Sequence, residues 1–400
     1  MSIYGDNAIK EIVAMKENFL AHIYRYTTLI LGMKPHEHEY KVMGLAPYAK
    51  DVDIQRILPV FGDLLQVEGM VIRWARKPPD LYFTLRERLE GKRFDHIAGA
   101  LQSFLENMLC EWFSAIAKQV GVKKFVFAGG VSQNIKACKA ISELDEIEDL
   151  FVSPAVGDTS LSVGAVYYDS LAMRRKYKIN KSALLSPLKV ATVGICFSDQ
   201  ECKQAIKGYR LKSKYHVMND AENGFLAKLL EEGLIIARFK GRMEFGLRAL
   251  GNRSILADPR DFGVVRKINE KIKNRDFWMP FSPTILDSYQ KKYIVNPKDL
   301  KSEFMTMAYE AADEGRKVLK AAMHPADLTL RPQILTQRAN PDYYDLISCF
   351  ARETGVGKLL NTSFNLHGFP IVGSVDKAVE TFENSELDGL ILESSLILRK

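Results

Sequence analysis

Two successive strand–turn–helix units constrain the fold of this chain more than any other feature of its sequence. KKFVFA, residues 123–128, has the composition of a buried strand and is followed by a glycine pair and a helical pattern. EDLFVSP, residues 148–154, predicts a second strand that again leads through a glycine turn into a helix. Such alternation is typical of a layered α/β domain. A longer amphipathic helix is predicted over residues 95–119, with Ile97, Leu101, Leu105, Leu109 and Phe113 on one face.

The α/β pattern restarts after a basic, polar segment, residues 176–188, which we interpret as a linker. A chain of 400 residues with 47% hydrophobic composition is long enough to form two cored domains. We therefore predict one α/β domain over residues 1–175 and a second over residues 189–400. The second is predicted to contain strands at 189–197, 234–239, 253–258, 358–364 and 389–398, and helices at 199–208, 221–232, 262–274, 342–354 and 374–383.

Composition argues against several classes of protein. No run of eighteen or more apolar residues predicts a membrane span, and the N-terminus lacks the order of a signal peptide. The five cysteines follow no repeating spacing, which favours reduced thiols in a cytoplasmic protein. The net charge of +7 suits anionic small molecules and is too weak to indicate nucleic-acid binding.

The stretch GRMEFGLRALGNRSILADPR, residues 241–260, has the composition of a binding loop rather than of a helix or a strand. Its arginines keep their charge and present planar forks that match phosphate or carboxylate oxygens. The interleaved apolar residues imply partial burial, and buried arginines require partners that a polyanionic ligand can supply. The polar residues singled out here are Arg242, Glu244, Arg248, Asn252, Arg253 and Ser254.

Two glycine turns in the first predicted domain suggest a nucleotide or metal cleft. In FAGGVSQN, residues 127–134, a glycine pair lets the backbone approach a ligand, and the following helix presents free N–H groups. In SPAVGDTSLSVGA, residues 153–165, Asp158 stands at the start of a helix. An isolated Asp at that position is more often a helix N-cap. The pairing of the two turns favours the ligand interpretation.

Two further segments carry weaker signals. NTSFNLHGFPIV, residues 361–372, places short hydroxyl and amide side chains after a predicted strand, although ordinary turns contain the same residues. Lys271, Lys273 and Arg275 precede an aromatic–proline segment and are as easily explained as cations at a helix end. His36 and His38 are interpreted as part of a solvated loop rather than as metal ligands.

Taken in order, these motifs resemble the carbamoyltransferase family that includes the NodU, CmcH and TobZ types. The resemblance runs from about residue 25 to residue 400 and rests on EYKVMGLAPYAK, FAGGVSQN, SPAVGDTSLSVGA, the arginine–glycine stretch, RDFWMPFSPTIL, RPQ at 331–333, NPDYYDLI and LLNTSFN. It implies part of an actin-like domain of the acetate-kinase/Hsp70 (ribonuclease H-like) type over residues 1–175. A YrdC-like α/β domain would follow over residues 189–400.

The resemblance also implies a two-step activity. The YrdC-like domain would form carbamoyl-adenylate from carbamoyl phosphate and ATP, with cations neutralising charge on the displaced phosphate oxygens. The actin-like domain would pass the carbamoyl group to a hydroxyl of a small-molecule acceptor, helped by a divalent metal ion such as iron. By this resemblance Lys41, Arg242, Arg248 and Arg253 are catalytic, Asp158 binds the metal, and Gly129, Gly130, Ser132, Asn134, Glu244, Asn252, Ser254, Arg275, Thr362, Ser363 and Asn365 contact the nucleotide or phosphate.

One departure from the family pattern affects the first domain. The aspartate–serine turn and the HHxxHA metal motif of the family do not occur in this sequence. We therefore expect the chain to begin inside the first domain, to transfer poorly alone, and to work with a separate N-terminal chain or a second copy of itself. Two alternatives stay open: a non-catalytic ATP-binding remnant or partner subunit, and a sugar-kinase-like phosphotransferase, which the C-terminal motifs disfavour.

Overall fold

The computed structural model describes residues 1–5, 8–16, 19–177, 190–273 and 275–400. The chain divides into two compact units, Met1–Leu188 and Lys189–Lys400. Both units combine helices and strands, so the predicted α/β class is confirmed. From residue 178 onward, the predicted linker lies outside the described residues. None of the helices in the described ranges combines the length and apolar composition needed to cross a membrane.

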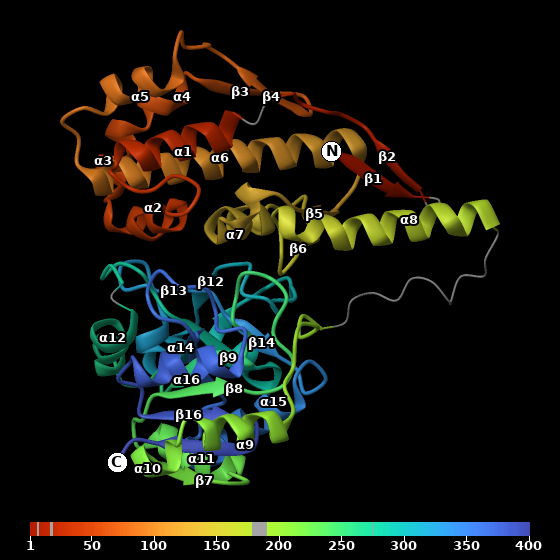
Figure 1. Cartoon of the computed structure of the whole chain (residues 1–400). Helices are drawn as coiled ribbons and strands as arrows, with labels where there is room; N and C mark the ends of the chain where they lie inside the picture. The colour runs from red at the N-terminus through yellow and green to blue at the C-terminus, as the bar shows by residue number, and fades with distance from the viewer. Residues whose placement is uncertain (6–7, 17–18, 178–189, 274) are drawn as a thin grey trace. The chain divides into compact units, whose positions relative to one another are not determined.

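The first unit is built around one long helix, α6 (Phe94–Val120) (Figure 1). The five residues predicted to form its apolar face are all buried, with at most 4% of their surface exposed. The helix ends at Gly121, whose φ of 72° is the left-handed conformation that commonly terminates helices. Against α6 pack α1 (Phe19–Ile30), α2 (Glu39–Leu45), α3 (Asp51–Ile57), α4 (Pro59–Gly62) and α7 (Ile135–Glu143). The unit also contains α5 (Leu81–Leu89), α8 (Leu161–Tyr177) and the hairpins β1 (Ser2–Gly5)–β2 (Ala8–Glu11) and β3 (Leu65–Glu68)–β4 (Val71–Trp74).

The two strands predicted in this unit form a parallel pair, β5 (Lys124–Phe127) and β6 (Asp149–Val152). Phe125 and Phe127 pack on Phe113 of α6, with ring centroids 5.3 and 5.2 Å apart. Val126 points to the opposite face and is 73% exposed. The expectation of a buried-type strand is therefore wrong for one of its faces, because successive side chains of a strand point to opposite faces and the aromatic contacts lie on only one of them.

The second unit contains an eight-stranded mixed sheet. Its β8–β16 and β10–β14 pairs are parallel and its other pairs are antiparallel. The strand order is β14 (Gln333–Leu335), β10 (Ser282–Leu286), β15 (Lys358–Ser363), β9 (Arg253–Ala257), β8 (Ile236–Phe239), β16 (Gly389–Leu392), β17 (Ser395–Leu398) and β7 (His216–Met218).

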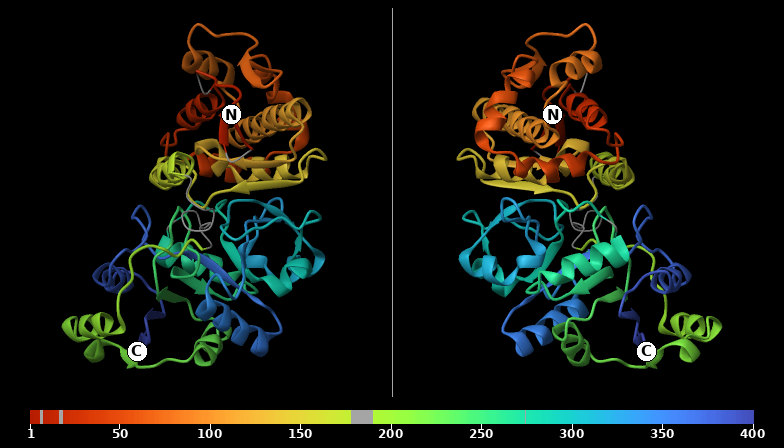
Figure 2. Two further views of the ribbon diagram at one scale, coloured as in Figure 1. Left: turned by 90° about the vertical axis from the view of Figure 1, so that its right-hand side faces the viewer. Right: turned by 90° about the vertical axis from the view of Figure 1, so that its left-hand side faces the viewer.

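Helices cover both faces of this sheet, as Figure 2 shows. Ala237 and Ile255 join the apolar core beneath α9 (Asp199–Gly208), α12 (Gly263–Ile268) and α16 (Val375–Glu383). The neighbouring Ile236 and Leu256 join the core beneath α11 (Asn223–Glu231) and α15 (Pro341–Thr354). Burial on both faces explains why these strands carry apolar residues at successive positions rather than at alternate ones. The unit also contains a small antiparallel sheet, β11 (Ile294–Val295), β12 (Tyr309–Ala311) and β13 (Thr329–Leu330), and the helices α10 (Leu211–Lys214), α13 (Gln290–Tyr293) and α14 (Asp313–Val318).

Three predicted elements of this unit differ in the structure. No strand forms in the described part of 189–197, where Gly194 N–H instead donates to the carbonyl of Met243 at 2.9 Å. The strand predicted over 389–398 is the β16–β17 hairpin, which turns at Glu393 with a φ of 50°. The helix predicted over 262–274 consists of α12 and a short π-helix, η4 (Asn269–Lys273).

Candidate functional site

The arginine–glycine stretch connects β8 to β9 as an irregular segment, residues 240–252, which we name the arginine loop. The predicted loop conformation is therefore confirmed. The two strands pair antiparallel, and the loop closes where Lys240 N–H donates to the carbonyl of Asn252 at 3.1 Å.

Glu244 holds the arginine loop together from within. The residue is 8% exposed, and its Oε1 accepts from the backbone N–H groups of Leu250, Asn252 and Arg253 at 2.7, 2.7 and 3.2 Å. Hydrogen bonds from backbone N–H groups to a carboxylate are charge-assisted and strong. The other oxygen, Oε2, is buried without a hydrogen-bond partner among the described residues. Glu244 therefore organises the backbone of the loop.

Three other predicted ligand residues also serve the loop itself. Arg253 is fully buried over the ring of Phe239, 3.8 Å from its centroid, and donates to the carbonyls of Gly241 and Asn252 at 3.1 and 2.9 Å. Burial lowers the pKa of Arg253, against the charge of Glu244. Asn252 Nδ2 donates to the carbonyl of Arg242 at 2.7 Å, and Ser254 Oγ accepts from Gly251 N–H at 3.0 Å. The Arg242 side chain is exposed and donates to the carbonyl of Gly194 at 3.2 Å.

Four predicted residues come together at one cavity of the second unit, which we name the arginine cavity. Arg248 reaches it from the arginine loop, Arg275 from the segment after η4, and Thr362 and Ser363 from the end of β15. Arg331, beside β14, also lines it. Segments far apart in the sequence thus place three guanidinium groups around one small space.

Arg331 is the strongest indication of what this cavity holds. Its Nε and Nη2 donate to Ser282 Oγ at 3.0 and 2.8 Å, and no carboxylate pairs with it among the residues that the structure describes. Burial holds the pKa of Arg331 well below its usual range, and the positive charges of Arg248 and Arg275 lower it further. An anion in the cavity would relieve this repulsion. Sequence reasoning missed Arg331 as a site residue, and the RPQ segment of the resemblance was the available signal.

Lys273, which the sequence left open as either a ligand-binding cation or a cation at a helix end, supports the turn formed by TSFN, residues 362–365. Only 1% of it is exposed, and its Nζ donates to Ser363 Oγ at 3.2 Å and to Asn365 Oδ1 at 2.6 Å. Burial lowers its pKa well below the usual value, and the nearby Arg275 adds to that shift. Asn365 is thereby tied into the turn and does not line the cavity. Thr362, only 6% exposed, does line it.

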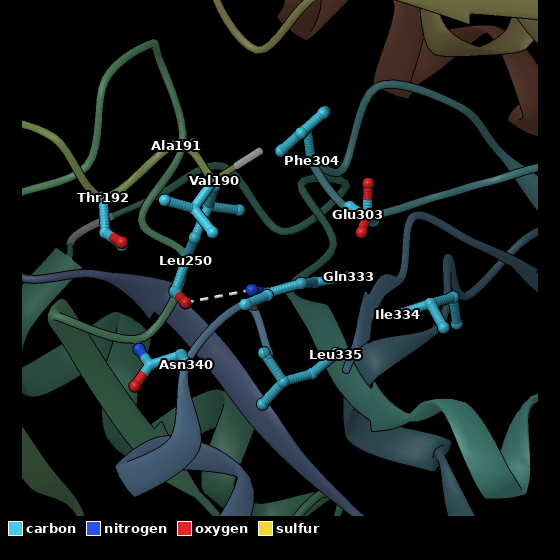
Figure 3. Close-up of a pocket in the computed structure, with 11 residues that line it drawn as sticks. Val190, Ala191, Thr192, Leu250, Glu303, Phe304, Gln333, Ile334, Leu335 and Asn340 are labelled. Carbon is cyan, nitrogen blue, oxygen red and sulfur yellow. Dashed lines mark hydrogen bonds between the residues drawn. The ribbon is translucent and has the colours of Figure 1, made fainter. Parts of the chain in front are cut away.

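Amide side chains fix the backbone that follows Arg248. Asn361 Nδ2 donates to the carbonyl of Ala249 at 3.2 Å, and Gln333 Nε2 to the carbonyl of Leu250 at 2.9 Å (Figure 3). Leu250 and Gln333 also wall a second pocket, in which Figure 3 shows the apolar side chains of Val190 and Phe304. The arginine cavity, unlike this second pocket, is lined by several cations.

In the first unit, the two predicted glycine turns lie side by side. Gly129 N–H donates to the carbonyl of Val156 at 2.8 Å, and Gly129 has a φ of 100° that favours glycine. Ser132 Oγ donates to the carbonyl of Gly129 at 2.7 Å, whereas Asn134 caps α7 and exchanges 2.9 Å hydrogen bonds with Gln102. The polar side chains of the turn are thus used internally, and the backbone of Gly129 and Gly130 is what stays exposed.

The metal site expected at Asp158 does not fit the described residues. Asp158 is exposed at the start of a 3₁₀ turn, Asp158–Ser160. No group of three or more His, Cys, Asp or Glu side chains in the described ranges could hold a metal ion. A tightly held metal generally needs about three protein ligands. Lys41, expected to be catalytic, lies half-buried on α2.

The second unit of this α/β chain thus brings three arginines together at one cavity, an arrangement that suits a small anion. The comparisons make the class specific: family models described as Carbamoyltransferase N-terminus and Carbamoyltransferase C-terminus match residues 4–167 and 227–399. The chain belongs to the carbamoyltransferase family. The match from residue 4 does not support the expectation that the chain begins well inside the first domain.

Relatives agree with this membership. An uncharacterized protein of Methanocaldococcus jannaschii is 31% identical, across 95% of this chain and 62% of its own length. Nodulation protein NolO of Bradyrhizobium diazoefficiens is 30% identical, across 100% and 73%. The 3'-hydroxymethylcephem-O-carbamoyltransferase of Amycolatopsis lactamdurans is 28% identical, across 90% and 65%. The chain thus spans less than two thirds of the first and third of these relatives.

Proposed function

We propose that this protein is an O-carbamoyltransferase whose second unit forms carbamoyl-adenylate from carbamoyl phosphate and ATP. The observation that supports the proposal is the convergence of Arg248, Arg275 and Arg331 on one cavity, with Arg331 lacking a carboxylate partner among the described residues. Guanidinium forks match phosphate oxygens and form charge-assisted hydrogen bonds with them. Both proposed substrates carry phosphate groups.

The balanced reaction consumes one water. Carbamoyl phosphate and water give carbamate and phosphate, and a carbamate oxygen then displaces pyrophosphate from the α-phosphorus of ATP. Negative charge gathers on the departing phosphate oxygens in both steps. Fixed cations in a partly dry cavity stabilise such charge. We assign this role to the three arginines, and a hydrogen bond to a phosphate oxygen to the Thr362 hydroxyl.

The second step of the proposal transfers the carbamoyl group to an acceptor. The Amycolatopsis relative is named for O-carbamoylation of a hydroxymethyl compound. We carry over the kind of acceptor atom, a hydroxyl of a small molecule. In the first unit, the exposed Gly129–Gly130 backbone is the proposed contact for the adenylate. Because the described residues do not fit a metal site, we assign no step to a metal ion.

The first prediction concerns Arg331. The full chain, given both substrates, is expected to release pyrophosphate. Arg331→Lys, which keeps the charge but loses the planar fork, is expected to lower kcat/KM for carbamoyl phosphate on the order of a hundredfold. Arg266→Lys is the matched control, because Arg266 is 81% exposed on α12. Pyrophosphate release that needs no carbamoyl phosphate, or equal activity of the two variants, would contradict the proposal.

A further inference from the structure

We propose that Asp342 is a positioning residue that holds the arginine loop in the shape needed to bring Arg248 into the arginine cavity. The proposal rests on the proposed function, because it concerns the binding of carbamoyl phosphate in that cavity. Asp342 does not line the cavity itself. It acts through the end of strand β8 and through the arginine loop.

Asp342 bridges two cations at the end of β8. Its Oδ2 accepts from Arg238 Nη2 at 2.6 Å, and its Oδ1 accepts from Lys240 Nζ at 2.7 Å. It lies in the first turn of α15, where the helix dipole favours a negative charge. Burial alone would raise the pKa of Asp342, but the charge of Arg238 and the hydrogen bonds from Lys240 and Arg238 hold that pKa below its ordinary value.

Arg238 connects Asp342 to the arginine loop. Its side chain is 2% exposed, and Nη1 donates to the carbonyl of Gly251 at 2.6 Å and to Asn252 Oδ1 at 2.8 Å. Asn340, the N-cap of the same helix α15, donates through Nδ2 to Asn252 Oδ1 at 2.7 Å. The N-terminal end of α15 therefore holds the Asn252 side chain by two routes, directly through Asn340 and indirectly through Asp342 and Arg238.

Asn252 fixes one end of the loop segment that contains Arg248. Its backbone N–H is bound by Glu244 at 2.7 Å, so one carboxylate and one amide fix the two ends of the segment 244–252. Arg248 lies within this segment, and its direction depends on both fixed points. When Asp342 loses its charge, Arg238 keeps a buried positive charge without a compensating carboxylate. The arrangement of Arg238, Asn252 and the loop then has to change.

The test separates positioning from general stability. Carbamoyl phosphate KM and kcat are measured by pyrophosphate release for Asp342→Asn and Asp345→Asn, each in the native and the Arg248→Lys background. Asp345, on the same helix, accepts from Asn223 Nδ2 at 2.8 Å and serves as the matched control. Asp342→Asn is expected to raise KM about tenfold with little change in kcat, and only about twofold when Arg248 is already lysine. Asp342→Glu, which restores the charge, is expected to recover part of the affinity.

A merely structural role would give a different pattern. Loss of folded protein would lower the apparent kcat by the same factor in both backgrounds, leave KM unchanged and overturn the proposal. Equal KM values for the two asparagine variants would overturn it as well. If the native chain releases no pyrophosphate, the proposed function fails, but calorimetric titration with inorganic phosphate still decides the role of Asp342. Weaker phosphate binding in Asp342→Asn than in Asp345→Asn would support it, and equal binding would refute it.

Discussion

At the scale of single residues, composition identified the right types of side chain but not their directions. Arg248 and Arg253 belong to the same arginine-rich stretch, yet the first lines the arginine cavity and the second is fully buried over Phe239. Arg253 begins a strand whose five residues are all buried, and the pairing of that strand directs its side chain inward. Pairing between distant strands cannot be read from local spacing, so the sequence could not separate the two arginines.

A prediction at this scale concerns Lys358, a fully buried lysine whose Nζ has no hydrogen-bond partner among the described residues and lies 5.5 Å from the centroid of the Tyr293 ring. Burial lowers its pKa to about 7, although the charge of Asp258 opposes the shift. In the unfolded chain its pKa is about 10.4, so the unfolded state binds more protons between these values. The free energy of unfolding should therefore rise with pH from about 7 to about 10. This added stability is lost again as the pH falls to about 7.

Lys358→Met should remove this part of the pH dependence and raise the free energy of unfolding at pH 7 by about 1–3 kcal/mol. Denaturant unfolding at several pH values between 7 and 10 measures both effects. Lys292→Met is the control, because the Lys292 side chain is 51% exposed. The same pH slope in the native chain and in Lys358→Met would show that the lysine stays charged in the folded state.

At the scale of elements, strands with apolar runs and helices with clear periodicity were predicted correctly. The long helix α6, the parallel pair β5–β6 and the central strands β8, β9 and β15 all form near the expected residues. The predicted elements that do not form lie where tertiary contacts, rather than the local sequence pattern, determine the backbone conformation. Residues 190–197 form backbone hydrogen bonds with the arginine loop instead of joining a sheet, and the run 389–398 folds back on itself at Glu393.

A glycine of the arginine loop permits a test at this scale. Gly251 has a φ of 117°, and a Cβ atom there would lie 2.3 Å from a ring atom of Tyr343. Gly251→Ala is expected to destabilise the protein by at least about 2 kcal/mol and to weaken phosphate binding. Gly224→Ala on α11 meets nothing within 4 Å and should be neutral or stabilising by up to about 1 kcal/mol. Thermal unfolding of both variants checks this, and similar melting temperatures would contradict the close packing of Gly251 on Tyr343.

At the scale of the whole molecule, the α/β class and the carbamoyltransferase family could be recognised from the sequence, because several spaced motifs act together. The cavity itself could be predicted in part. Arg248, Arg275, Thr362 and Ser363 were expected and do meet, but Arg331 was not singled out, because its RPQ segment carries no local pattern that indicates a ligand site. Its importance depends on the two other arginines, which only the fold brings near it.

The two units provide a further test. Carbamoyl phosphate alone is expected to slow amide hydrogen exchange in the second unit, around residues 247–249, 331 and 361–363, because ligand binding stabilises the segments it contacts. Exchange in α6 of the first unit should be unchanged. Mass spectrometry of peptides with and without the ligand measures this. Slower exchange confined to the first unit would place the carbamoyl phosphate site elsewhere.

The three N–H groups gathered by Glu244 have a consequence for the thermodynamics of ligand binding. A loop whose backbone is already tied to a buried carboxylate has little conformational freedom left to lose when an anion arrives. Binding should therefore carry only a small entropic penalty from ordering the loop, and most of the electrostatic attraction becomes affinity. The same preorganisation limits adaptability: a larger anion cannot be accommodated by bending the loop, so discrimination between phosphates of different size would come from rigidity.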